Sequence, residues 1–156
     1  LLGEDNAPNP SEATLAALGA CLAVGVHANA TARGIKLSKL ELQLEGDINV
    51  TAVWGTGDLD EAKTLGFSAV RVKIDAEGDA PQEEIDDIIK HSNVWSPVAN
   101  TLRNNVKVEV THVTAVEVEE TAGLYNAGVR IVAGQTGHLV FERRLGLLEF
   151  HGRYFQ

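Results

Sequence analysis

The spacing of apolar and polar residues divides the chain into segments with different periods. The longest apolar segment covers residues 13–32, which contain no Lys, Arg, Asp or Glu and are half Ala or Gly. A turn-forming prefix, DNAPNP, precedes it, and Ser11 suits the N-cap of a helix with Glu12 in its first turn. Gly34 is a typical stop signal. These features predict a helix of about 22 residues, ~33 Å long.

The following segments alternate as strands do, or repeat at helical spacing. Alternating apolar and polar residues predict strands at residues 39–50, 68–75 and 106–118. Ile85, Ile88 and Ile89 after a proline predict an amphipathic helix. The stretch SPVANTLRNN predicts a short helical turn or loop. Because the strands are joined without long crossovers, this order of elements predicts an α+β fold.

The end of the chain has a less regular pattern. Two strand-like runs lie on either side of GQTG at residues 134–137, which predicts a hairpin.

Composition narrows the classes of function. A chain of 156 residues fits one domain that buries a core without metal or disulfide staples. A net charge of −9 argues against binding to nucleic acid or to an anionic membrane surface. One cysteine excludes an internal disulfide framework, and the absence of a basic leader with a cleavage site favours a soluble, cytoplasmic protein.

The charge-free segment has the length of a membrane span, but its composition favours a different structure. Residues 13–32 are only weakly hydrophobic and include His27 and Asn29. We therefore predict no membrane span. We expect a helix that is buried on all sides, with a partner subunit covering part of it.

Cys21 is the candidate nucleophile. It lies about ten residues into the predicted helix, too far from the N-terminus for the helix dipole to activate the thiol. None of its neighbours on the helix face is a base, so activation requires another element, with Arg71 and Arg103 as candidates. A small buried hydrophobic residue is the structural alternative. The five histidines show no metal-ligand spacing, and no phosphate or dinucleotide loop occurs, so we predict no metal and no cofactor.

Three stretches resemble the OsmC/Ohr family. LLGEDNAPNPSEATLAALGACL is similar to the segment in which a Gly-Glu-Asp loop enters a long central helix bearing the peroxidatic cysteine. ARGIKLSKLELQLEG resembles the exit of that helix into a strand, and HSNVWSPVANTL resembles the second cysteine motif, where Cys-Pro-Val is usual. The resemblance covers residues 1–118, which we predict to be an OsmC-like domain. Residues 119–156 would be a hairpin-like extension of open role.

The resemblance implies an intertwined homodimer with two active sites at the subunit interface. It also implies thiol-dependent reduction of organic or hydrogen peroxides, with Cys21 at the position of the first cysteine. In such a mechanism the thiolate becomes a sulfenic acid, which the second cysteine converts to a disulfide that a dithiol reopens.

The sequence departs from the family pattern at three places. Ser96 stands at the second-cysteine position, so no intramolecular disulfide can form. The family's active-site glutamate lies ten residues before the cysteine, where this chain has Ser11; Glu12 follows one residue later, as in a divergent branch. Because Glu12 would point away from Cys21 on an ideal helix, it is a weak catalytic candidate. The family's activating arginine belongs to a region that would precede Leu1.

Three interpretations follow from the resemblance and its departures. The first is a stress-related thiol protein, a one-cysteine organic hydroperoxide reductase whose Cys21 sulfenate is resolved by an external thiol. The second is a non-enzymatic OsmC-fold dimer that binds a small apolar ligand in the interface pocket, and the third is a dimer without a ligand. Cys21 favours the first and Ser96 favours the other two, so the sequence leaves open whether the protein is an enzyme.

Overall fold

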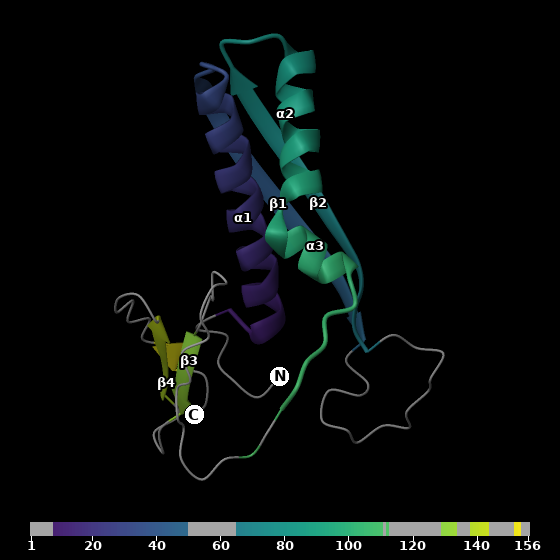
Figure 1. Cartoon of the computed structure of the whole chain (residues 1–156), viewed down its shortest axis with the longest axis vertical. Helices are drawn as coiled ribbons and strands as arrows, with labels where there is room; N and C mark the ends of the chain where they lie inside the picture. Colours follow the sequence, from purple (N-terminus) through teal and green to yellow (C-terminus); the bar gives the residue numbers. More distant parts are fainter. Residues whose placement is uncertain are drawn as a thin grey trace. The chain divides into compact units, whose positions relative to one another are not determined.

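The computed structural model describes residues 8–49, 65–110, 112, 129–133, 138–143 and 152–153 (Figure 1). The chain divides into two compact units, Ser11–Val106 and a unit made of Leu1–Pro10 with Lys107–Gln156, and each is described by itself. The predicted α+β class is confirmed. In chain order the elements are α1 (Pro10–Ala32), β1 (Leu37–Asn49), β2 (Gly66–Gly78), α2 (Gln82–Trp95), α3 (Pro97–Arg103), β3 (Val129–Ala133), β4 (His138–Arg143) and β5 (Gly152–Arg153).

The long helix α1 has a sharply defined end. It begins at Pro10, so Ser11 lies inside the first turn and not at the predicted N-cap. A proline suits this position because its missing N–H would have no partner within the helix. At the other end Gly34 has a φ of +75°, and the N–H groups of Gly34 and Ile35 bond back to the carbonyls of Thr31 and Ala30. This left-handed glycine cap confirms the predicted stop.

The strands β1 and β2 pair antiparallel, with Leu42 opposite Ile74 and Leu44 opposite Val72. Both extend beyond the predicted 39–50 and 68–75, although residue 50 lies outside the described residues. Their alternation places apolar side chains on the face toward the helices and charged side chains on the exposed face. Within this unit, α1, α2 and α3 lie over the same face of the strand pair (Figure 1).

The core of this unit consists of two hydrophobic clusters that follow α1. One is built on buried residues of α1, α2 and the turn into β1: Val26, Ala30, Ile35 and Ile88. The other joins α1 to α3 and the sheet through Leu18, Leu22 and Ala99, with Leu42, Leu44, Val70, Val72 and Val98 packed against them. Together the two clusters pack α1 along its length against the strand pair and the two shorter helices.

The helix predicted after Pro81 is α2. Ile85 and Ile88 are buried and Ile89 is partly buried, as the helical spacing requires. The stretch predicted to be a short helical turn or loop contains α3, which begins at Pro97 immediately after α2 ends.

The predicted strand at residues 106–118 is wrong over the part that the structure describes. Residues 105–110 and 112 have no regular structure, and Val108 and Val110 are 79% and 92% exposed. A strand needs a neighbouring strand for its backbone groups and an apolar surface for its alternate side chains. In the described ranges no strand pairs with this segment. Residues 111 and 113–118 lie outside the described residues.

The two strands of the hairpin predicted on either side of GQTG are confirmed. β3 pairs antiparallel with β4, with Ile131 opposite Phe141, and β4 pairs with β5. These three strands form a sheet of their own. The residues of the turn, 134–137, lie outside the described part of the chain. The limits 1–118 and 119–156 stay a prediction.

The outward face of α1 carries no charged residue after Glu12 in its first turn. It is formed by small apolar residues that are exposed in the single chain: Ala13, Ala16, Ala17, Ala20, Val24 and Ala28. The expectation of burial on all sides is therefore not met by one chain, because the sheet and the two shorter helices cover one side only. By length and composition α1 is also long and apolar enough to cross a membrane, a test that core helices of soluble proteins pass as well.

Candidate functional site

Cys21 lies near the middle of α1, beside the apolar cluster that joins α1 to α3. It is a free thiol and is partly exposed. It comes eleven residues after the start of the helix, which corresponds to about 16 Å along the axis. The partial charge at a helix N-terminus acts within about one turn, so α1 itself gives little electrostatic help to this sulfur.

Ser96 meets Cys21 from the junction between α2 and α3. Its hydroxyl donates a hydrogen bond of 3.2 Å to Cys21 Sγ. The same oxygen accepts the backbone N–H of Ala99 at 3.2 Å and so caps the N-terminus of α3. The extended backbone of Ser96, with φ −67° and ψ 118°, and Pro97 at the first helical position are typical of such a cap. Ser96 is 4% exposed.

The contact between Cys21 and Ser96 belongs to a seam along which α1 and α2 run antiparallel. The seam is formed by Cys21, Gly25, Asn29 and Arg33 on one side and by Ser96, Ser92 and Asp87 on the other. Four residues further along α1, a Cβ on Gly25 would lie 3.3 Å from Ser92 Cβ, so the glycine allows a close approach. One turn beyond, the Asn29 side chain donates to Gly25 O at 2.8 Å and to Ser92 Oγ at 3.4 Å. Because these residues repeat every four positions, they hold the two helices at the spacing that lets Ser96 reach the sulfur.

The far end of this seam is closed by an ion pair. Arg33 Nη1 lies 2.8 Å from Asp87 Oδ2, joining the end of α1 to α2. Both side chains are exposed enough for water to weaken this pair, so it adds orientation more than stability.

Glu12 is not brought to the sulfur by the fold. It lies in the first turn of α1 and is exposed. Nine residues separate it from Cys21, which is about 180° around the helix and about 13 Å along it. Of the three residues proposed from the sequence, the structure places Cys21 and Ser96 together and Glu12 apart from them.

The two arginines considered as activating cations are engaged elsewhere. Arg71 makes a two-pronged contact with Asp47, at 2.7 and 2.6 Å, on the charged face of the strand pair. The hydrogen bond from Arg71 holds the pKa of Asp47 below its ordinary value, and the pair raises the pKa of Arg71. Arg103 bonds to the carbonyl and side-chain oxygens of Asn93. In the described part of the chain, the polar partner of Cys21 Sγ is the Ser96 hydroxyl.

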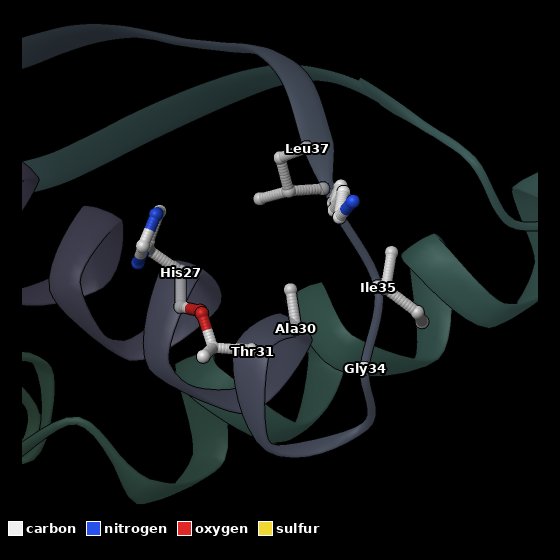
Figure 2. A pocket seen from close by; sticks show the side chains of 7 residues that line it. His27, Ala30, Thr31, Gly34, Ile35 and Leu37 are labelled. Atoms are coloured by element: carbon white, nitrogen blue, oxygen red, sulfur yellow. The ribbon is translucent and has the colours of Figure 1, made fainter.

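A separate hollow of about 370 Å³ lies at the end of α1, and Cys21 is not among its lining residues. Figure 2 shows His27 of α1 and Leu37 of β1 on two sides of it, with Ala30 between them. Thr31, Gly34, Ile35 and Lys36 complete the lining. Among the described residues, no group of three His, Cys, Asp or Glu side chains is arranged to hold a metal ion.

Sequence reasoning found Cys21 and Ser96 but missed the residues that position them. The repeat Cys21, Gly25, Asn29, Arg33 at intervals of four marks the α1 side of the seam and was a readable signal. The Ser-Pro pair at residues 96 and 97 is a second one, since it is typical of a helix start. No signal in the sequence indicated that Ser92 is the partner of Gly25 and Asn29.

The fold and the Cys21–Ser96 contact define an α+β protein whose cysteine on a long helix faces the junction of two shorter helices. The family model described as OsmC-like protein matches residues 3–111, more than half of the chain. The chain belongs to this family. Comparison with curated proteins gives no match.

Two solved structures are similar to this chain. An OsmC like protein from Mycoplasma pneumoniae has 21% sequence identity and a TM-score of 0.53, over 65% of this chain and 67% of that chain. A structure from Legionella pneumophila, described as an organic hydroperoxide resistance protein OsmC, predicted redox protein and regulator of sulfide bond formation, has 23% identity and a TM-score of 0.46, over 69% and 70%. At such identities the first likeness shows the fold.

Proposed function

We propose that the protein is a one-cysteine thiol peroxidase that reduces organic hydroperoxides at Cys21. The observation that supports this most is the 3.2 Å hydrogen bond from the Ser96 hydroxyl to a partly exposed sulfur in an OsmC-like fold. The Cys21 thiolate attacks the terminal peroxide oxygen. The S–O bond forms and the O–O bond breaks, the sulfur is oxidised to a sulfenic acid, and the alkoxide leaves with a proton as an alcohol.

The sulfenic acid is resolved by an external thiol, because the partner at the second-cysteine position is Ser96. One thiol displaces water from the sulfenic acid and forms a mixed disulfide with Cys21. A second thiol attacks the outer sulfur, which releases Cys21 in its reduced form and one molecule of external disulfide. Two thiols are thus oxidised for each peroxide reduced.

The functional form is a homodimer in this proposal. The support is the outward face of α1, which carries no charged residue beyond Glu12 and where Val24 is 69% exposed, together with Trp95 at 72% near the end of α2. An apolar surface of this kind on a protein that acts in water is typical of an interface. A second copy would also close over the sulfur, which is only partly covered by its own chain.

Oxidation of the whole protein by cumene hydroperoxide tests the proposed activity. We expect Cys21 to be oxidised at least about 10-fold faster than free cysteine, with one sulfenic or mixed-disulfide product and no internal disulfide by mass spectrometry. Peroxide consumption should stop after one equivalent without added thiol and continue with it. Cys21→Ser should abolish both. A wild-type rate equal to that of free cysteine would refute the proposal.

Restoring a thiol at the second position tests the geometry of the site. Ser96→Cys should form a peroxide-driven disulfide with Cys21, seen as the loss of both free thiols, because the present side-chain atoms are 3.2 Å apart. Ser92→Cys is the matched control, since Ser92 is equally buried and faces Gly25. A disulfide in the control and none in Ser96→Cys would contradict the arrangement of the seam.

Ligand binding without catalysis is the second candidate function, favoured by the hollow at the end of α1. Its apolar lining includes Ala30, Ile35 and Leu37. A fluorescent apolar probe should then shift the amide resonances of Thr31 and Leu37 in a titration followed by nuclear magnetic resonance. Resonances that stay in place would count against this candidate.

A further inference from the structure

We propose that Ser96 is a positioning residue whose hydroxyl is held as a hydrogen-bond donor to Cys21 Sγ, so that it stabilises negative charge on the attacking sulfur. This role rests on the proposed function and deepens it, because it gives the serine at the second-cysteine position a task of its own. Ser96 then substitutes for the lost thiol by preparing the attacking sulfur, and not by resolving the oxidised one.

The direction of the hydrogen bond follows from the other partner of the hydroxyl. A serine hydroxyl has one proton to donate and two lone pairs that accept. The N–H of Ala99 points at the oxygen from 3.2 Å, so the oxygen accepts there. The single proton is therefore left for Cys21 Sγ, also at 3.2 Å. Since Ser96 is 4% exposed, bulk water has little access to turn the hydroxyl away.

This arrangement distinguishes the two protonation states of the cysteine. A thiol can donate its own proton as well as accept one, and both of its hydrogen bonds are weak. A thiolate has no proton and only accepts, and a bond to a charged acceptor is the stronger kind. Because Ser96 is buried, water screens this bond less on the side of the donor.

The expected size of the effect comes from two opposing factors. A hydrogen bond to a charged acceptor generally contributes a factor of about 10 to 100 in favour of the charged form. A stabilised thiolate is also a weaker nucleophile, with a Brønsted coefficient of about 0.4–0.5. The net gain in reactivity is therefore about 3- to 10-fold near neutral pH. At high pH, where the thiol is fully ionised in every variant, only the loss of nucleophilicity remains.

Alkylation of the whole protein by iodoacetamide tests this inference without a peroxide. Compared with wild type, Ser96→Ala should react about 3- to 10-fold more slowly near pH 7 and about 3- to 10-fold faster near pH 10.5. Ser96→Thr keeps the hydroxyl and should restore the wild-type rates. Ser68→Ala removes an exposed serine of β2 that bonds to Asp47 O, outside the seam, and should react like wild type at both pH values.

A variant that keeps the helix cap separates chemistry from folding. Glycine is tolerated at an N-cap at a cost of a few tenths of a kcal/mol, so Ser96→Gly removes the donor without the penalty of alanine and should show the same reversal of rates. Equal rates in wild type, Ser96→Ala and Ser96→Gly would overturn the inference. A change in the same direction at both pH values would also overturn it, since it would indicate altered access to the sulfur.

The two proposals fail in different ways. In one case the alkylation rates show the predicted reversal while cumene hydroperoxide oxidises the wild-type protein no faster than free cysteine. That result supports the role of Ser96 and contradicts the peroxidase activity. A protein that is oxidised rapidly whether or not the hydroxyl is present retains the peroxidase and loses the role of Ser96.

Discussion

The two sides of α1 both lack charged residues beyond Glu12, but they differ in side-chain size and in environment. The inward side presents Leu18, Leu22, Val26 and Ala30, all of which are buried against the sheet and the shorter helices. The outward side presents a similar series of uncharged residues that the chain leaves exposed. The absence of charged residues therefore indicates that most of the helix surface is to be buried. The rest of the fold determines which side of the helix is buried by its own chain.

Cys21 lies at the border between these two sides. Its neighbour Leu22 is buried, whereas Val24 two residues later is 69% exposed. The sulfur is thus fixed by the core through Ser96 and still accessible from outside. A fully buried cysteine would be inert and a fully exposed one would lack fixed partners, so the border is a favourable place for a reactive thiol.

Truncating one residue on each side should give the largest contrast. Leu22→Ala should lower the free energy of unfolding by about 2–5 kcal/mol, because it opens a cavity at a residue that is 3% exposed. Val24→Ala should cost about 0.5 kcal/mol or less at low protein concentration. Urea denaturation followed by circular dichroism measures both. A cost for Val24→Ala that rises with protein concentration would show that a second copy covers Val24.

A charge on the outward side should separate the two subunits. Val24→Glu should weaken dimerisation by about 100-fold, equivalent to about 2.7 kcal/mol, because an unpaired carboxylate would be buried in the interface. Sedimentation equilibrium measures the dissociation constant.

Gln43→Glu is the matched control for this charge. It adds the same carboxylate to the exposed face of β1 and should leave the dimer intact. A wild-type protein that is monomeric at micromolar concentration would contradict the dimer itself. An unchanged constant in Val24→Glu would mean that another surface makes the interface.

Overpacking the inward side should have an intermediate effect. Gly19 is buried, and a Cβ at this position would lie 3.0 Å from Leu44 Cδ1. Gly19→Leu should therefore lower the free energy of unfolding by about 1–3 kcal/mol. Ala20→Leu, on the outward side, should change it by less than about 0.5 kcal/mol. Both are best compared in a Val24→Glu background, so that dimerisation does not contribute; equal costs would place Gly19 outside a close contact.

The sequence predicted the elements whose signals are local. The end of α1 follows from Gly34, and α2 follows from the spacing of its isoleucines, because both depend on backbone and side-chain geometry within a few residues. The resemblance of residues 91–102 to the family's second cysteine motif indicated that Cys21 and Ser96 belong together. The strand predicted at residues 106–110 was wrong because alternating residues form a strand only when another strand pairs with them.

The rest depends on contacts between segments far apart in the sequence. Leu18, Leu22 and Val26 mark the inward side of α1 by their spacing, but nothing in the sequence identifies Ser92 and Ser96 as the residues that this helix meets. The separation of Arg71 from the cysteine could not be read either, because its partner Asp47 is fixed by the pairing of β1 with β2. The positions of Arg71 and Arg103 in space, and not their residue type, determined that both have partners other than the thiol.

The charged face of the strand pair should contribute least, in contrast to the apolar side of α1. Arg71 lowers the pKa of Asp47, so this carboxylate stabilises the fold fully above the ordinary carboxyl pKa of about 3.9. The contribution is lost as the pH falls through the lowered value in the native state. Asp47→Asn should therefore shift the urea midpoint slightly downward near pH 6, and the difference from wild type should shrink as the pH falls below the ordinary carboxyl pKa. Because both side chains are about half exposed, 0.5 M NaCl should reduce the shift.

Glu77→Gln removes the same charge from an exposed position of β2 and should shift the midpoint less. A difference between Asp47→Asn and wild type that persists at low pH would assign the effect to backbone or packing changes and not to the ion pair.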